Sequence, residues 1–308
     1  MTGITVAGVR RTFGDVVAVD AMDLEVPAGQ VTALVGPNGS GKTTLLLILA
    51  TLLTPDTGTV RVAGYDPVTQ PREVRRRTGW MPDAFGTWET LTCREVLATV
   101  ADAYRLPRPA AAARISELLA LVHLADLAER PTQVLSRGQK QRLGLARALI
   151  HSPEVLLLDE PASGLDPRSR IELRGVVRGL ARAGAAVLIS SHVLAELDEL
   201  ADRAVIVARG RTFAVESLEP GRDTPRPWRL RALDDARLLA GLDALGRVHG
   251  GPGPDGVEVE IRSDADAAEL LAALVRDGVP MVALHPASGV LEHAYLALTQ
   301  DALTEDRR

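Results

Sequence analysis

A glycine-rich stretch near the N-terminus has the composition of a phosphate-binding loop. It reads GPNGSGKTT from Gly36 to Thr44 and fits the spacing G-x-x-x-x-G-K-[ST]. Its glycines lack a Cβ, so consecutive backbone N–H groups can curl around a β-phosphate. We expect Lys42 to place its charge at the β- and γ-phosphates and Thr43 to offer an oxygen ligand to Mg²⁺. The stretch therefore predicts binding of a nucleoside triphosphate.

Two adjacent carboxylates end the apolar run VLLLDEP. Asp159 lies at the end of a predicted buried strand, where it can hold a Mg²⁺-bound water. Glu160 points to the opposite side and can accept a proton from an attacking water. His192 ends the run LISSH, at the sheet edge where open α/β sheets bind ligands, and we expect it to donate to the γ-phosphate. The alternatives without a catalytic function are a strand-end cap for the carboxylates and a structural role for the histidine.

A second small anion-binding pattern, LSRGQ, lies far along the chain from the glycine-rich stretch. Ser136 is placed as the N-cap of the helix that follows, and Gly138 removes a side chain where a ligand could approach. An ordinary capped helix is the alternative. Because the chain already has one phosphate loop, a second anion-binding helix end is explained if it closes the site of another molecule.

The elements that must position these residues alternate between strands and helices. Continuous apolar runs over 31–35, 154–161 and 185–192 are typical of buried parallel strands. Two strands joined by a tight turn precede the first of them, and a helix follows the glycine-rich stretch. From about 88 to 150 the pattern is helical, with apolar residues at helical spacing in 113–130. This stretch predicts an inserted helical subdomain.

The domain organisation follows from a change in composition near the middle of the chain. We expect a nucleotide-binding domain over 1–216, a linker rich in proline, glycine and charge over 217–227, and an accessory domain over 228–308. The last part is predicted to run strand, helix, strand, strand, helix, strand, and the second of these strands is the stretch RVHG at 247–250. That order predicts a small ferredoxin-like α/β domain, with a final helix from 289 to 300.

Composition argues against several classes of function. The chain has 308 residues and a formal net charge of -5, without a dense basic tract, which argues against nucleic acid as a partner. The single cysteine, Cys93, excludes an internal disulfide. No apolar run reaches the roughly 20 residues needed to cross a bilayer, and the N-terminus lacks the apolar block of a signal peptide. We therefore expect the chain to stay in the cytosol.

Taken together, the ordered motifs resemble the nucleotide-binding subunit of ABC transporters over about residues 4–215. The glycine-rich stretch matches the Walker A motif, VLLLDEP the Walker B motif, LSRGQ the signature, SGLDP at Ser163 to Pro167 the D-loop, and His192 the switch histidine. The resemblance implies a P-loop NTPase core with an antiparallel β subdomain. It also implies a head-to-tail dimer of two copies, with ATP and Mg²⁺ between one copy's Walker A motif and the other's Ser136 and Gly138.

The resemblance also assigns roles to individual residues. It implies catalytic roles for Glu160, His192 and Lys42, and metal ligands at Thr43, Asp159 and Asp83. Phe13 takes the place of the aromatic residue that stacks on adenine, with a core residue as the alternative. The residues that the resemblance places at the nucleotide are Phe13, Asn38, Gly39, Ser40, Gly41, Lys42, Thr43, Thr44, Ser136, Gly138, Gln139 and Asp166.

Two positions depart from the family pattern. Asp83 stands where the family usually has a glutamine at the entrance to the helical subdomain. A carboxylate can still face Mg²⁺, but it is shorter and charged. Arg137 replaces the first glycine of the common signature, whereas the second glycine, Gly138, is retained. We expect the site to work, because Gly138 is the residue that permits close approach.

The C-terminal stretch VLEHAYLALT resembles the ending of ATPases that serve ABC-2 type exporters of drugs, antibiotics and lipids. The function implied is ATP hydrolysis that drives a separately encoded membrane permease, from the inner face of the cell membrane. A soluble ABC ATPase acting mechanically on nucleic acid or ribosomes is the alternative, but such relatives carry two cassettes or a long coiled coil. A regulator that does not hydrolyse ATP is disfavoured, because Glu160 and His192 are both present.

Overall fold

The computed structural model of the chain describes residues 3–84, 86, 88–218, 225–287, 289, 291–292 and 295. The chain divides into two compact units, with the division between Ser217 and Leu218. The expected linker over 217–227 lies mostly outside the described residues. Within the described part, none of the helices has the length and apolar character that a membrane crossing requires.

The first unit is built on a six-stranded sheet. Its strands, in spatial order, are β5 (Thr78–Met81), β6 (Val155–Asp159), β7 (Ala186–Ser190), β3 (Val31–Val35), β8 (Arg203–Ala208) and β9 (Arg211–Ser217). The first five are parallel, and only β9 runs antiparallel to its neighbour. Every residue of β3, β6 and β7 is buried, as expected for parallel strands that are covered on both faces. The three apolar runs predicted as buried strands are thus confirmed.

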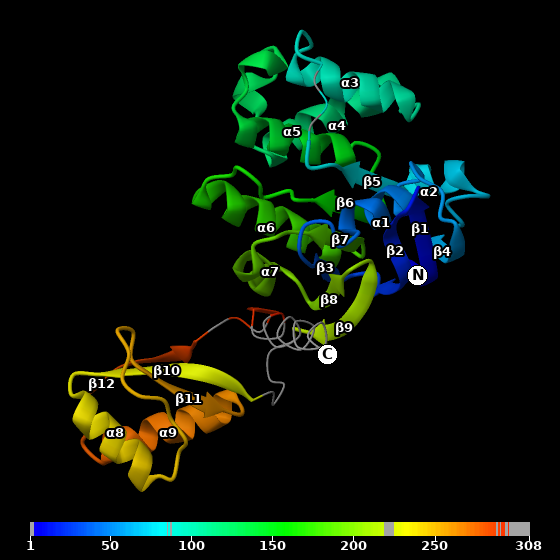
Figure 1. Ribbon diagram of the computed structural model, residues 1–308. Helices are drawn as coiled ribbons and strands as arrows, with labels where there is room; N and C mark the ends of the chain where they lie inside the picture. The colour runs from blue at the N-terminus through cyan, green and yellow to red at the C-terminus, as the bar shows by residue number, and fades with distance from the viewer. Residues whose placement is uncertain are drawn as a thin grey trace. The chain divides into compact units, whose positions relative to one another are not determined.

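Helices cover both faces of this sheet. Figure 1 shows α1 (Lys42–Leu49) on one side and α6 (Pro167–Arg182) and α7 (Leu194–Leu200) on the other. A short helix, α2 (Pro71–Arg77), leads into the edge strand β5. Because β3, β6 and β7 are parallel neighbours, the loops at their carboxyl ends meet at one edge of the sheet. This edge is where parallel sheets bind ligands.

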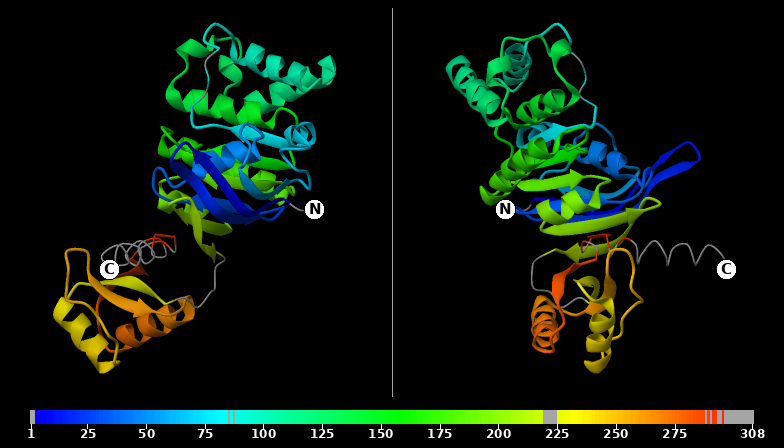
Figure 2. Two further views of the ribbon diagram at one scale, coloured as in Figure 1. Left: turned by 45° about the vertical axis from the view of Figure 1, so that its right-hand side comes forward. Right: turned by 90° about the vertical axis from the view of Figure 1, so that its left-hand side faces the viewer.

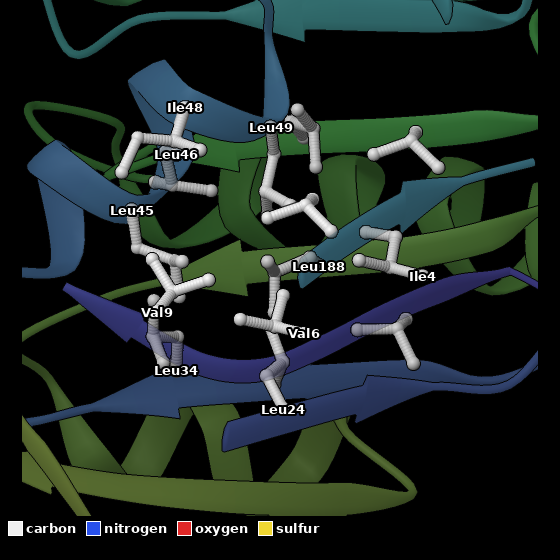
Figure 3. Packing of buried hydrophobic residues seen from close by; sticks show 14 of the residues in the cluster. Ile4, Val6, Val9, Leu24, Leu34, Leu45, Leu46, Ile48, Leu49 and Leu188 are labelled. Atoms are coloured by element: carbon white, nitrogen blue, oxygen red, sulfur yellow. The ribbon is translucent and has the colours of Figure 1, made fainter. Parts of the chain in front are cut away.

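A separate three-stranded antiparallel sheet packs over α1. It consists of β2 (Val16–Val26), β1 (Ile4–Phe13) and β4 (Thr57–Val62), in that order. Figure 3 shows Ile4, Val6 and Leu24 of this sheet facing the leucines of α1, with Leu34 and Leu188 of the larger sheet in the same cluster. Burial of this apolar surface joins the two sheets through α1, and thereby fixes the start of that helix.

The helical subdomain forms a distinct layer beyond the edge strand β5 (Figures 1 and 2). It contains α3 (Cys93–Ala103), α4 (Arg108–Leu121) and α5 (Arg137–Leu149), with short 3₁₀ turns at Ala125–Leu127 and Thr132–Val134. The apolar residues at helical spacing on α4, among them Ile115, Leu118 and Leu119, are buried. Both α3 and α5 begin with a capping box, so each helix start is fixed by local hydrogen bonds.

The second unit is a small α/β layer. It runs β10 (Arg226–Ala232), α8 (Asp235–Ala244), β11 (Val257–Ile261), α9 (Asp264–Arg276) and β12 (Met281–Pro286). The central β10 pairs antiparallel with β11 and with β12. Apolar residues of this sheet and of both helices form a separate core.

One predicted element of the second unit is wrong. The stretch RVHG was expected to form a fourth strand, but His249 makes only an isolated bridge to Val259. The sequence Gly250, Gly251, Pro252 follows directly, and glycine and proline both disfavour a continued strand. The predicted final helix, residues 289 to 300, lies mostly outside the described residues.

Candidate functional site

The glycine-rich stretch forms a tight loop between β3 and α1. Gly41 adopts φ 98°, in the left-handed region that other residues avoid, and directly precedes the helix. A Cβ on Gly36 would lie 2.1 Å from the carbonyl oxygen of Val207, so the start of the loop packs directly on the backbone of β8. Only glycine fits at these two positions, which explains the motif in terms of this fold.

Lys42 and Ser40 give the loop its polar interior. The Lys42 Nζ donates to the carbonyl oxygens of Gly36 at 2.7 Å and Pro37 at 3.0 Å. Burial lowers the pKa of the Lys42 ammonium, and the charges of Glu160 and Asp159 oppose that shift. The buried Ser40 Oγ has no hydrogen-bond partner among the described residues. A buried unpaired hydroxyl in a loop of N–H groups is suited to an anionic ligand.

Asp159 is held at the carboxyl end of β6 by two hydroxyl groups. Its side chain accepts from Thr43 Oγ1 at 3.1 Å and from Ser190 Oγ at 2.5 Å. The residue is 4% exposed, so the carboxylate is fixed next to the phosphate loop rather than free in solvent. Sequence reasoning missed Ser190. Ser190 pairs with Asp159 across adjacent parallel strands, which only the fold reveals. The one hint in the sequence is its position two residues before His192.

Glu160 and His192 form a contact at the same edge of the sheet. Glu160 Oε2 and His192 Nδ1 lie 2.8 Å apart, so a proton on Nδ1 donates to the carboxylate. Glu160 has φ 50°, an uncommon conformation for a non-glycine residue, and its N–H donates to the Ser190 carbonyl oxygen at 3.1 Å. The backbone of β7 therefore helps to set the direction of the Glu160 side chain.

The signature forms a helix tip. Ser136 Oγ accepts from the Gln139 N–H at 3.3 Å, and Gln139 Oε1 accepts from the Ser136 N–H at 2.9 Å. The prediction that Ser136 caps a helix is confirmed. The side chain of Gln139, expected at the nucleotide, also serves this cap. Among the described residues, no hydrogen bond or ion pair joins Ser136, Gly138 or Gln139 to the phosphate loop.

Phe13 lies at the end of β1, with 48% of its surface exposed. The guanidinium of Arg11 lies over its ring, 4.9 Å from the centroid. Asp56 accepts from Arg11 Nη1, from the Thr12 N–H and from Thr12 Oγ1, each at 2.7 Å. These bonds, those from Thr12 above all, lower the pKa of Asp56. The exposed ring is thus carried on a well-bonded strand end, which is a suitable base for stacking.

The remaining predicted residues have different surroundings. Asn38 and Gly39 are exposed in the phosphate loop, and Thr44 is partly buried in the first turn of α1. Asp166 is the N-cap of α6: its carboxylate accepts from the Ser169 N–H at 3.0 Å and from Ser169 Oγ at 2.6 Å. These bonds lower the pKa of Asp166.

Asp83 is exposed, and its backbone carbonyl accepts from Gln141 Nε2 at 3.0 Å. Within the described ranges, no cluster of three or more His, Cys, Asp or Glu side chains could hold a metal by itself. One buried carboxylate, Asp159, together with the hydroxyl of Thr43, is instead the kind of partial oxygen set that Mg²⁺ completes with phosphates and water.

Comparison with known proteins adds independent findings. The family model described as ABC transporter matches residues 19–163. The daunorubicin/doxorubicin resistance ATP-binding protein DrrA of Streptomyces peucetius is 34% identical over 303 residues, which covers 96% of this chain and 92% of that protein. The daunorubicin resistance ATP-binding protein DrrA3 of Streptomyces coeruleorubidus is 43% identical over 213 residues, covering 69% of this chain and 67% of that protein.

Solved structures agree with the fold. A bacterial ABC transporter cassette determined as a dimer superposes with a TM-score of 0.65 at 25% identity, covering 70% of this chain and 99% of that one. The predicted α/β core with an antiparallel β subdomain and an inserted helical subdomain is therefore confirmed, and a small C-terminal sheet is present as well.

Proposed function

The chain belongs to the ATP-binding subunits of ABC transporters, and from this premise we propose that it hydrolyses ATP to drive a separately encoded membrane permease that exports a drug-like substrate. Hydrolysis of ATP for transport is the activity of the family. The observation that carries the proposal is the contact between Glu160 and His192 beside the phosphate loop. It supplies a carboxylate base and its orienting partner where the γ-phosphate of a loop-bound nucleotide would lie.

In this proposal each residue has one task. The N–H groups of the phosphate loop and the Lys42 ammonium bind the β- and γ-phosphates. Glu160 accepts the proton of the attacking water, and His192 orients Glu160 and donates to the γ-phosphate. Thr43 and Asp159 would hold Mg²⁺, the carboxylate directly or through water, and the ion would neutralise phosphate charge. We also propose Asp83 as a ligand to this metal; its carboxylate is exposed.

The proposed site is completed by a second copy of the chain. The Ser136 hydroxyl and the Gly138 N–H lie at the start of α5, where the first N–H groups of a helix lack partners within the helix and attract anions. Head-to-tail pairing would place the partner's Ser136 and the partner's Gly138 against the γ-phosphate held by the other chain. Gln139 would fix the tip through the capping box, Asp166 would position the D-loop, and Phe13 would stack on the adenine.

The type of cargo is proposed from the near full-length similarity. The match to the Streptomyces peucetius resistance protein covers 96% of this chain, and so extends into the second unit. We therefore propose export of compounds of the daunorubicin and doxorubicin kind. The ATPase would act at the inner face of the membrane, bound to its permease.

The test of the shared site is dimerisation of the variant Glu160→Gln. With ATP and Mg²⁺, light scattering should show a dimer of this variant and a monomer without nucleotide, because the bound ATP is not consumed. The matched control is Glu117→Gln, an exposed glutamate on α4 that pairs with Arg114, which should hydrolyse ATP like the parent. A Glu160→Gln variant that stays monomeric at saturating ATP refutes the shared site.

The test of export uses cells that carry the chain and a candidate permease. They should accumulate less daunorubicin than cells with the permease alone, and Glu160→Gln should abolish the difference. Equal accumulation in all three strains refutes this type of cargo for that pair, while the dimerisation result stands separately.

A further inference from the structure

Arg137, the residue that replaces the first glycine of the common signature, contacts the D-loop of its own chain. Its Nη2 donates to Ser163 Oγ at 2.7 Å. Its side chain also runs along Gly164, since a Cβ placed on Gly164 would lie 2.8 Å from Arg137 Cδ and 2.9 Å from its Nε. The side chain therefore occupies space that only a glycine leaves open.

A backbone contact supports the same junction. A Cβ on Gly138 would lie 3.2 Å from Leu165 Cδ2 and 3.4 Å from the Gly164 carbonyl oxygen. The start of α5 thus lies directly on the segment Ser163–Leu165. Gly164 has φ 74°, so this segment turns in a conformation that glycine permits. The two surfaces fit closely at the point where Arg137 bridges them.

The same segment is held from its other side by α6 and α7. Arg170 Nε donates to the Leu165 carbonyl oxygen at 3.1 Å, and Arg170 Nη1 lies 2.7 Å from Glu196 Oε1. Glu196 is in the first turn of α7, four residues after His192. Burial raises the pKa of Glu196, and the nearby Arg170 and His192 oppose this shift. The segment Ser163–Leu165 therefore lies between the signature tip and the element that follows the switch histidine.

We propose that Arg137 is a positioning residue that joins the signature tip to the segment Ser163–Leu165, so that the half-site offered to a partner and the half-site that holds Glu160 move together. This inference rests on the shared site proposed above. It adds that nucleotide binding at one half-site changes the position of the other half-site of the same chain. A glycine at position 137 has no side chain with which to make this connection.

The first test measures the junction in the isolated chain, without nucleotide. The amides of Ser163 and Leu165 donate to the carbonyl oxygens of Glu160 and Ala162, so their hydrogen exchange reports on the order of the segment. Losing one hydrogen bond in Arg137→Ala should speed their exchange roughly fivefold. Arg137→Lys should give an intermediate rate. Exchange at the parental rate in Arg137→Ala overturns the proposal.

The matched control is Arg168→Ala. Arg168 is a neighbouring arginine, 88% exposed, that pairs only with Glu172 along α6 in the described structure. Its removal should leave exchange at Ser163 and Leu165 unchanged. An equal acceleration in Arg168→Ala would show that the effect is a general loosening of α6, and that also overturns the proposal.

The second test measures communication. Turnover of the parent should rise cooperatively with ATP concentration, and the Hill coefficient of Arg137→Ala should fall toward 1, while ATP affinity of the diluted monomer stays within about twofold of the parent. Arg137→Lys should retain part of the cooperativity. A noncooperative parent, or an Arg137→Ala variant with the parental coefficient, overturns the inference. Failure of Glu160→Gln to dimerise would instead refute the shared site, so the two failures are distinguishable.

Discussion

The phosphate loop with its strand-end carboxylates and the signature tip are both anion-binding geometries, but they differ in how far one chain completes them. Lys42 and Asp159 are 8% and 4% exposed and bonded to groups from several elements. Ser136 is exposed, and among the described residues its side chain bonds only within the first turn of its own helix. One half is therefore assembled inside the chain, whereas we propose that the other is a preformed surface that meets the nucleotide of a second copy.

The largest expected effect lies in the assembled half. Glu160→Gln should lower the rate of phosphate release by about 10²–10⁴-fold, since a general base contributes about that much. ATP affinity should remain close to the parental value, because the phosphate loop is unchanged. Steady-state phosphate assays and nucleotide titration check the two parts. Turnover within threefold of the parent would show that Glu160 is not the base.

The second effect tests the preformed half. Ser136→Ala should lower turnover roughly ten- to a hundredfold, the range for one hydrogen bond to a charged group, while ATP binding to the monomer is unchanged. The loss should appear as weaker ATP-dependent dimerisation when the change is combined with Glu160→Gln. Sedimentation at several protein concentrations measures the dimer constant in each background.

The chain supplies a matched control for Ser136→Ala. Thr92 begins α3 with the same capping box, in which its side chain accepts from the Glu95 N–H at 3.2 Å. Thr92→Ala and Ser136→Ala should each lower the free energy of unfolding by about 1 kcal/mol. Only Ser136→Ala should impair dimerisation. An equal loss of dimerisation in both variants would assign the effect to helix capping and would contradict a ligand at the tip.

The difference between the halves also explains what the sequence could predict. The apolar strands and the cap at Ser136 depend on neighbours within a few residues, so local patterns predicted them correctly. Ser190 at Asp159 and Arg137 at Ser163 are contacts across 31 and 26 positions, which no local pattern contains. The prediction of a strand at His249 was wrong because a local pattern was given too much weight. The apolar pattern there is short, and the glycines and proline after it end the pairing.

A smaller effect is expected at Phe13, the exposed residue proposed to stack on the adenine of a nucleotide bound at the phosphate loop. Phe13→Ala should weaken ATP binding roughly tenfold without abolishing it, because base stacking contributes about 1–3 kcal/mol and the phosphate contacts remain. Fluorescent nucleotide titration measures the change. Phe213→Ala is the control, since Phe213 is similarly exposed, at 45% against 48% for Phe13. An equal loss in both variants would contradict adenine stacking at Phe13.

The smallest effect concerns the pH dependence of stability at His151. This residue follows the C-terminal end of α5, the helix whose N-terminal end is the signature tip. His151 stacks on Tyr104 with ring centroids 3.8 Å apart, and Nε2 lies 3.2 Å from the Thr78 carbonyl oxygen. Burial lowers its pKa from 6.5 to about 4. As pH falls below 6.5 the unfolded chain takes up the proton first, so the stability present at neutral pH is lost progressively between about pH 6.5 and about pH 4. Allowing for partial exposure, the part of this loss that falls between pH 7 and pH 5 is about 1 kcal/mol. His151→Gln, measured by urea unfolding at both pH values, should lose less stability on acidification than the parent, whereas the exposed His123→Gln should match the parent. If His151→Gln and the parent lose the same amount, then His151 does not couple stability to pH.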